Sequence, residues 1–132
     1  MRQNDKPQFY LDRRKIGILG EESAAIHYRE DGYDIFSANY HSRFGELDLV
    51  AFRDNTVVFV EVRTRDARAV ITPAETVDHH KQRKLILTAR SYLANYPELN
   101  DYNMRFDVVE VFYEGGYRCR INRIENAFSL NQ

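Results

Sequence analysis

The segment GELDLVAFRDNTVVFVEVRTR, residues 45–65, places acidic side chains among valines and leucines. The acidic residues of interest are Glu46, Asp48 and Glu61, and Arg63 follows the last of them. Apolar residues alternate on both sides of Asp54-Asn55, a pattern that predicts two β-strands joined by a two-residue turn. Carboxylates are uncommon inside apolar strands, so we interpret this hairpin as the first candidate for a functional site.

The turn length fixes which residues of the hairpin are opposed. A two-residue turn pairs Arg53 with Thr56 and, further along the strands, Asp48 with Glu61. Because side chains alternate, two opposite faces are expected. The first face carries Glu46, Asp48, Val50, Phe52, Val57, Phe59, Glu61 and Arg63. The second face carries Leu47, Leu49, Ala51, Val58, Val60 and Val62.

Two directly opposed carboxylates repel each other. With Cβ atoms roughly 5 Å apart and an effective dielectric of about 20, the repulsion is about 3 kcal/mol. Protonation of one carboxylate, the cation of Arg63 or a bound divalent metal ion could each offset it. An exposed charge ladder, in which each pair contributes only ~0.2 to 1 kcal/mol, is the plainer interpretation. A Mg²⁺ site is the more specific interpretation, because Mg²⁺ binds one or two protein carboxylates and keeps its other positions for water and phosphate.

The rest of the chain supplies the elements that must position these residues. RRKIGILGEESAAIHYREDGY predicts a helix that ends near Gly32, and DIFSANY predicts a strand. A second helix is predicted from Thr72 as N-cap, with Pro73 and Glu75 in its first turn, to about Tyr96. A second hairpin turns at Gly115-Gly116. The order helix, three strands, helix, two strands predicts an α/β sandwich with a mixed central sheet flanked by helices.

Composition limits the class of protein. The 132 residues are 43% hydrophobic, enough for one buried core, and we expect a flexible N-terminal segment at residues 1–13 followed by a single domain at 14–132. A lone cysteine, Cys119, and no apolar h-region favour the cytoplasm and no membrane association. Net charge is -1, so any binding of phosphate must come from a local patch. Residues 63–90 hold such a surplus of basic side chains.

Several segments resemble one known family. LGEESA, GELDLVA, VFVEVRTR, VDHHKQRK and RFDVVEV occur in the order and approximate spacing of the YraN-like family of predicted nucleases, once catalogued as uncharacterised protein family 0102. That family is similar to the restriction-endonuclease-like superfamily, near the archaeal Holliday junction resolvases. The superfamily motif is an Asp, a gap and then Glu-x-Lys, and Asp48 with Glu61-Val62-Arg63 falls on it. The resemblance implies a restriction-endonuclease-like three-layer sandwich.

The resemblance also implies roles. Asp48, Glu61 and the main-chain carbonyl of Val62 would hold Mg²⁺ or Mn²⁺, and no small-molecule cofactor is implied. Glu21 falls on the first-helix acid of the resolvases. A helical wheel does not choose between Glu21 and Glu22, so the choice of Glu21 rests on the family match.

Arg63 departs from the superfamily pattern. The usual lysine can orient or deprotonate water, whereas a guanidinium stays protonated and can only stabilise charge. Arg63 would then stabilise the transition state, and slow cleavage is one possible consequence.

Phosphate contacts are expected from four basic residues outside the motif: Arg43, Arg65, Lys81 and Lys84. Asp107, in the RFDVV segment, is expected to support the fold through Arg105 or a turn. The resulting hypotheses are a metal-dependent endonuclease acting on branched or junction DNA with little sequence preference, a nucleic-acid-binding module without catalysis, and an interaction domain. A homodimer is expected by analogy with the resolvases.

Overall fold

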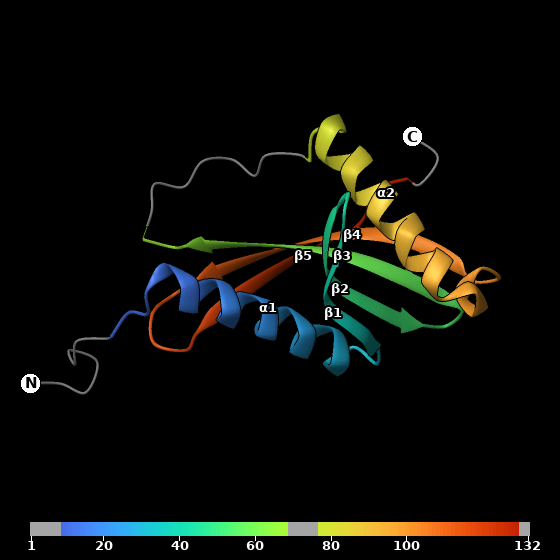
Figure 1. The fold of residues 1–132 in the computed structure, drawn as a ribbon. Coiled ribbons are helices and arrows are strands. Elements are labelled where there is room, and N and C mark those ends of the chain that lie inside the picture. Colours follow the sequence, from blue (N-terminus) through green and yellow to red (C-terminus); the bar gives the residue numbers. More distant parts are fainter. Residues whose placement is uncertain (1–8, 69–76, 130–132) are drawn as a thin grey trace, which may run out of the picture.

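The computed structural model describes residues 9–68 and 77–129 (Figure 1). A five-stranded mixed sheet with the order β1-β2-β3-β4-β5 forms the middle layer. Helix α1 (Arg13–Glu30) covers one face and helix α2 (His79–Asn95) the other, as Figure 1 shows. The strands are β1 (Asp34–Ser42), β2 (Gly45–Arg53), β3 (Thr56–Asp66), β4 (Asn103–Tyr113) and β5 (Cys119–Phe128), with a short 3₁₀ helix, η2, at Pro97–Leu99. The predicted three-layer α/β sandwich and element order are confirmed.

The β2–β3 hairpin has the predicted turn. Asp54 and Asn55 adopt φ values of 51° and 60°, the left-handed conformation that a type I′ turn requires at both central residues. The antiparallel register runs from Arg53–Thr56 to Leu49–Val60, as the turn length predicts. β3 then pairs with β4 in parallel, and β4 pairs with β5 antiparallel through the second predicted hairpin.

Each face of the sheet carries its own core. The core under α2 includes Val50, Val57, Phe59, Leu85, Ala89, Tyr92, Phe106 and Val108. The core under α1 includes Ala24, Tyr28, Leu49, Ala51, Val58, Val60, Val109 and Val111. The hairpin therefore contributes to both cores near its turn, and α2 buries Leu85, Ala89 and Tyr92, whereas Tyr96 is 40% exposed.

The alternation of β2 slips by one residue near its amino-terminal end. Leu47 and Val50 both pack in the core under α2, although they are three residues apart. The prediction that Leu47 shares a face with Leu49 is therefore wrong. Residue Asp48 lies at the slip and lines a cavity beside α1 together with Leu49. It does not face the α2 side with Val50, as regular alternation predicted.

β1 has a matching irregularity opposite this point. Asn39 has a φ of 55°, in the left-handed region that Asn tolerates better than most residues. The β1–β2 register places Ala38 against Leu49 and Tyr40 against Leu47, so Asn39 lies between these pairs, across from Asp48. The distorted backbone of both strands turns Asn39 and Asp48 towards α1.

The helix ends were predicted with different success. α1 is capped by Asp12, whose side chain accepts a hydrogen bond from the Lys15 amide (2.9 Å). The helix ends before Gly32, which has a φ of 84°, so the predicted end near Gly32 is confirmed. α2 begins at His79, not near Thr72. Its N-cap is Asp78, which accepts from the Lys81 amide (2.8 Å). The predicted cap residues Thr72, Pro73 and Glu75 lie outside the described residues. The predicted end near Tyr96 is confirmed.

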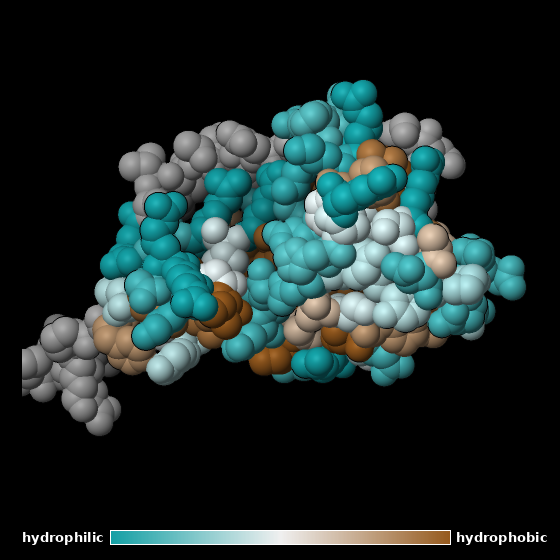
Figure 2. Space-filling view, in the orientation of Figure 1, coloured by the Kyte–Doolittle hydropathy of each residue, from teal (hydrophilic) through white to brown (hydrophobic). Residues whose placement is uncertain are grey.

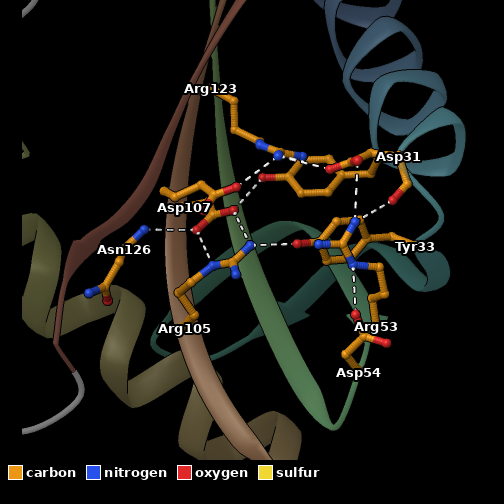
Figure 3. A network of polar contacts seen from close by, with 10 residues as sticks. Asp31, Tyr33, Arg53, Asp54, Arg105, Asp107, Arg123 and Asn126 are labelled. Atoms are coloured by element: carbon orange, nitrogen blue, oxygen red, sulfur yellow. Dashed lines mark hydrogen bonds and ion pairs between the residues drawn. The ribbon is translucent and has the colours of Figure 1, made fainter.

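A buried polar network joins α1 to the sheet at the carboxyl-terminal end of the helix (Figure 3). Asp107 accepts hydrogen bonds from the Tyr28 hydroxyl (2.7 Å), the Arg105 guanidinium (2.8 Å) and the Asn126 amide (3.0 Å). Asp107 therefore supports the fold through Arg105 and a neighbouring strand, as the sequence suggested.

Residues 9–12 lead into α1 beside the β4–β5 turn, where the Gly116 amide donates to the Phe9 carbonyl (2.8 Å). The domain boundary at residues 13–14 stays a prediction. Among the described residues, no helix is both long and apolar enough to cross a membrane.

Candidate functional site

The candidate site lies where β2 separates from β3. Backbone pairing between the two strands ends at Leu49–Val60, whereas β3 stays paired with β4 as far as Asp66. In Figure 1, β1 and β2 turn away from the direction in which β3 continues. Beyond the last backbone pair, the Val62 amide donates to Oδ2 of Asp48 (2.7 Å). The Asp48 carboxylate thus takes the place of a backbone acceptor in this opening.

The carbonyl of Val62 faces the same opening. An extended residue directs its amide and its carbonyl towards the same neighbouring strand. Since the Val62 amide meets Asp48, the Val62 carbonyl also points towards β2. This orientation suits the metal-ligand role that the family resemblance implies for Val62.

Glu61 reaches the opening from the α2 side. Val60 and Val62 pack with the core under α1, so the intervening Glu61 points to the opposite face. There its Oε1 lies 3.2 Å from Nζ of Lys81, in the first turn of α2. The expected direct opposition of Asp48 and Glu61 on one face of the sheet is therefore wrong. The two carboxylates approach the opening from different sides.

The carboxylates nevertheless interact electrostatically. Asp48 is only 8% exposed, and burial raises its pKa to about 7. The hydrogen bond from Val62 acts in the opposite direction, and the charges of Glu61, Glu21 and Glu46 raise the pKa further. Asp48 is thus a buried acid surrounded by like charges, an arrangement that a cation would stabilise.

Glu21 belongs to the same group of acids. It lines the cavity of about 440 Å³ between α1 and the β1–β2 strands, together with Glu22, Asn39 and Asp48. Burial and the charge of Glu46 raise the Glu21 pKa, and a hydrogen bond from Asn39 lowers it. Of the two candidate helix acids, Glu21 contributes to the raised pKa of Asp48.

A close helix–strand contact brings Glu21 to the site. The preceding residue, Gly20, packs against Thr64 of β3 so closely that an added Cβ would lie 2.0 Å from the Thr64 hydroxyl. Only glycine permits this approach of α1. The contact holds the first half of α1 against the strand that carries Glu61.

The predicted basic residues occupy different positions around the opening. The hydrogen bond from the Lys81 amide is the main cause that lowers the pKa of Asp78, the N-cap of α2. The charge of Arg63 lowers this pKa further. Arg65 is further along β3, with Nε 4.0 Å from Oε2 of buried Glu110. Arg43 is exposed in the β1–β2 turn and Lys84 is exposed on α2. The face of α2 seen in Figure 2 is hydrophilic at its amino-terminal end.

The sequence reasoning missed Asn39 and the contact of Lys81 with Glu61. Asn39 could have been noticed, because Asn is depleted in strands and tolerates left-handed backbone. The Lys81–Glu61 contact joins α2 to β3 and leaves no local pattern in the sequence.

The donor set fits a hard cation. Carboxylate and carbonyl oxygens from Asp48, Glu61 and Val62 are the ligands that Mg²⁺ and Mn²⁺ prefer. Within the described ranges, no three or more His, Cys, Asp or Glu side chains are grouped so as to hold an ion by themselves. Mg²⁺ usually keeps several waters and is bound through one or two protein carboxylates.

Comparison with known proteins identifies related chains. The model of "Uncharacterised protein family UPF0102" matches residues 20–111. A UPF0102 protein of Alkaliphilus oremlandii is 43% identical over 87% of this chain and 98% of its own length. A UPF0102 protein of Syntrophomonas wolfei is also 43% identical, over 87% of this chain and 98% of its own. One from Caldanaerobacter subterraneus is 37% identical over 89% and 98%.

Proposed function

Since this chain belongs to the uncharacterised protein family UPF0102, its chemistry has to be inferred from the site, and we propose that it is a metal-dependent endonuclease that hydrolyses phosphodiester bonds in DNA. The observation that carries the proposal is the buried Asp48 carboxylate in the opening between β2 and β3, bonded to Val62 and surrounded by Glu21, Glu46 and Glu61. The resemblance to the restriction-endonuclease-like superfamily supports the same assignment.

Each residue of the site has a proposed part in the reaction. Asp48, Glu61 and the Val62 carbonyl would hold Mg²⁺ or Mn²⁺. A bound ion would supply Lewis-acid chemistry, which would polarise the scissile phosphate and make the attacking water more acidic. Glu21 adds a further acceptor for water in the cavity beside Asp48. Arg63 stabilises the negative charge that develops on the phosphate.

The basic residues outside the motif are proposed to contact the phosphates on either side of the cleaved bond. These residues are Arg43, Arg65, Lys81 and Lys84. Contacts to the DNA backbone give affinity and orientation without reading sequence. We therefore expect little sequence preference. The resemblance to junction resolvases favours branched DNA and a homodimer, because cutting two strands requires two active centres.

The metal requirement can be tested by thermal unfolding. An ion that binds only the folded protein at 100 times its Kd stabilises it by about 2.7 kcal/mol. For a domain of this size we expect Mg²⁺ or Mn²⁺ to raise the Tm by about 5 °C or more. Asp48→Ala should abolish the increase. An unchanged wild-type Tm at millimolar metal would remove the metal site and leave the interaction-domain hypothesis.

Cleavage is tested with labelled duplex, flap, fork and four-way-junction DNA in the presence of each metal. We expect products from the branched substrates and none with Asp48→Ala. Binding of DNA without products at any metal concentration would instead identify a non-catalytic nucleic-acid-binding module.

A further inference from the structure

We infer that Lys81 of α2 is a catalytic residue that supplies the lysine ammonium of the proposed nuclease centre, holding the attacking water and a non-bridging phosphate oxygen beside Glu61. The inference rests on the proposed function and reassigns Lys81 from flanking phosphate contact to the reaction itself. It answers the question that Arg63 raises, namely where an active-site lysine comes from when β3 offers an arginine.

The position of Lys81 is fixed by the start of α2. Its amide is bound by the Asp78 side chain (2.8 Å), which anchors the first turn of the helix. From there Nζ of Lys81 reaches Oε1 of Glu61 at 3.2 Å. The Glu61 side chain is 12% exposed and that of Lys81 48%, so the ammonium lies between a mostly buried carboxylate and solvent. An incoming phosphate would approach from that open side.

Arg63 and Lys81 come from different elements, β3 and α2. The charge of Arg63 acts on Asp78, at the cap of α2, whereas Lys81 contacts Glu61. The second helix therefore brings a lysine to Glu61, the carboxylate that Arg63 follows by two positions in β3. Arg63 lies two residues after Glu61 on the same strand, and its charge reaches Asp78 at the start of the same helix.

The chemistry of an ammonium suits this place. It is compact and offers three donors, so one can remain on Glu61 while others bind water and a phosphate oxygen. A guanidinium is planar and larger, and it cannot take the same three directions. In the reaction, the water oxygen bonds to phosphorus, and the bond from phosphorus to the leaving sugar oxygen breaks. The water proton goes to solvent, and the leaving oxygen receives one from solvent. Lys81 transfers no proton in this step.

If Lys81 only binds DNA, its loss should weaken binding. If it takes part in the chemical step, its loss should lower the rate constant for cleavage. We propose single-turnover cleavage of the best branched substrate at saturating DNA, with Lys81→Met, Lys84→Met and Lys15→Met. Lys81→Met should lower the rate constant by about 100-fold or more and change the DNA Kd by less than about threefold. Lys84→Met should weaken binding and preserve the rate at saturation. Lys15, which is exposed in the first turn of α1 and has no assigned part in the site, provides the matched control.

Rescue gives the sharpest comparison. Arg63→Lys restores a lysine at the motif position of β3. In the Lys81→Met background this second change should recover at least about tenfold in rate, because one ammonium replaces the other. In the presence of Lys81, the same Arg63→Lys change should give no comparable gain.

Metal affinity without DNA supplies a readout besides activity. Because Lys81 neutralises Glu61, Lys81→Met should tighten Mn²⁺ binding several-fold in calorimetry, and Lys15→Met should not change it. Cleavage by Lys81→Met at the wild-type rate, or failure of Arg63→Lys to rescue its loss, would overturn the inference while the nuclease proposal stands. A wild-type protein that cuts no substrate with any metal would overturn both.

Discussion

At the scale of single residues, Asp48 is the acid whose burial has the clearest energetic consequence. Its pKa rises from 3.8 to about 7, so the folded protein binds the proton more tightly than the unfolded chain does. The contribution of Asp48 to stability is therefore most favourable below pH 4 and is lost as the pH rises towards 7 and above. The full shift corresponds to roughly 4 kcal/mol.

We predict that Asp48→Asn stabilises the metal-free protein at pH 8 and has little effect at pH 4. Asn keeps an oxygen that can accept from the Val62 amide and removes the buried charge. The expected gain is about 1 to 3 kcal/mol at pH 8, smaller than the full shift because neighbouring acids relax. Urea unfolding in chelator at both pH values measures it, with exposed Asp34→Asn as control. Equal effects at the two pH values would contradict the prediction.

Asn39 combines a left-handed backbone conformation with a side-chain hydrogen bond to Glu21. Its φ of 55° orients the side chain, whose amide bonds Glu21. We predict that Asn39→Ala destabilises the protein by about 1 kcal/mol more than Asn39→Gly, because glycine accepts the left-handed backbone and alanine does not. Both variants should weaken Mn²⁺ binding equally, since both lose the Glu21 contact. Urea unfolding and calorimetry measure the two effects, and equal stability of the variants would show that the backbone at position 39 is unstrained.

At the scale of elements, the packing of α1 on β3 depends on one glycine. An alanine Cβ at position 20 would lie 2.0 Å from Oγ1 and 2.9 Å from Cβ of Thr64, so rotation of the threonine cannot remove the clash. At Gly17, one turn earlier in the helix, an added Cβ meets nothing within 4 Å. The same substitution should therefore have opposite effects at the two positions.

We predict that Gly20→Ala costs about 2 to 4 kcal/mol of unfolding free energy, in the range of overpacking strain. Gly17→Ala should stabilise by about 0.5 to 1 kcal/mol, the usual benefit of alanine in a helix interior. Chemical unfolding of both variants gives the comparison. If Gly20→Ala also stabilises, α1 does not depend on this close approach and the position of Glu21 is set elsewhere.

Periodicity predicted the elements well because it reports which faces are buried. The turn at Asp54-Asn55 predicted the register through Leu49–Val60, since turn length and register are linked. The alternation rule failed at Asp48, where the irregular backbone of β2 moves side chains to the opposite face of the sheet. No local sequence pattern indicates this irregularity. The start of α2 was misplaced because Thr72-Pro73 carries a cap signal in the sequence, whereas the side chain of Asp78 caps the helix in the structure. The site arises from these irregular points.

At the scale of the whole molecule, α1 is fixed to the sheet at two points. The Gly20–Thr64 contact fixes its first half, and the Tyr28–Asp107 hydrogen bond fixes its second half. The network of Figure 3 extends the second contact, because Arg105 also donates to the Tyr33 hydroxyl (2.9 Å). α1, β4 and β5 thus share one fully buried carboxylate.

We predict that Asp107→Asn destabilises the whole domain by about 3 to 5 kcal/mol, the cost of breaking an ion pair in which the carboxylate is fully buried and the Arg105 side chain is mostly buried. Tyr28→Phe removes one donor and leaves Asp107 paired with Arg105 and the Asn126 amide, so its cost should be about 1 kcal/mol. Urea unfolding followed by far-ultraviolet circular dichroism and tyrosine fluorescence measures both. Because the network spans three elements, the two probes should report one coincident transition in each variant. Equal costs for the two substitutions, or loss of α1 in a separate earlier transition, would show that the network does not tie the layers together.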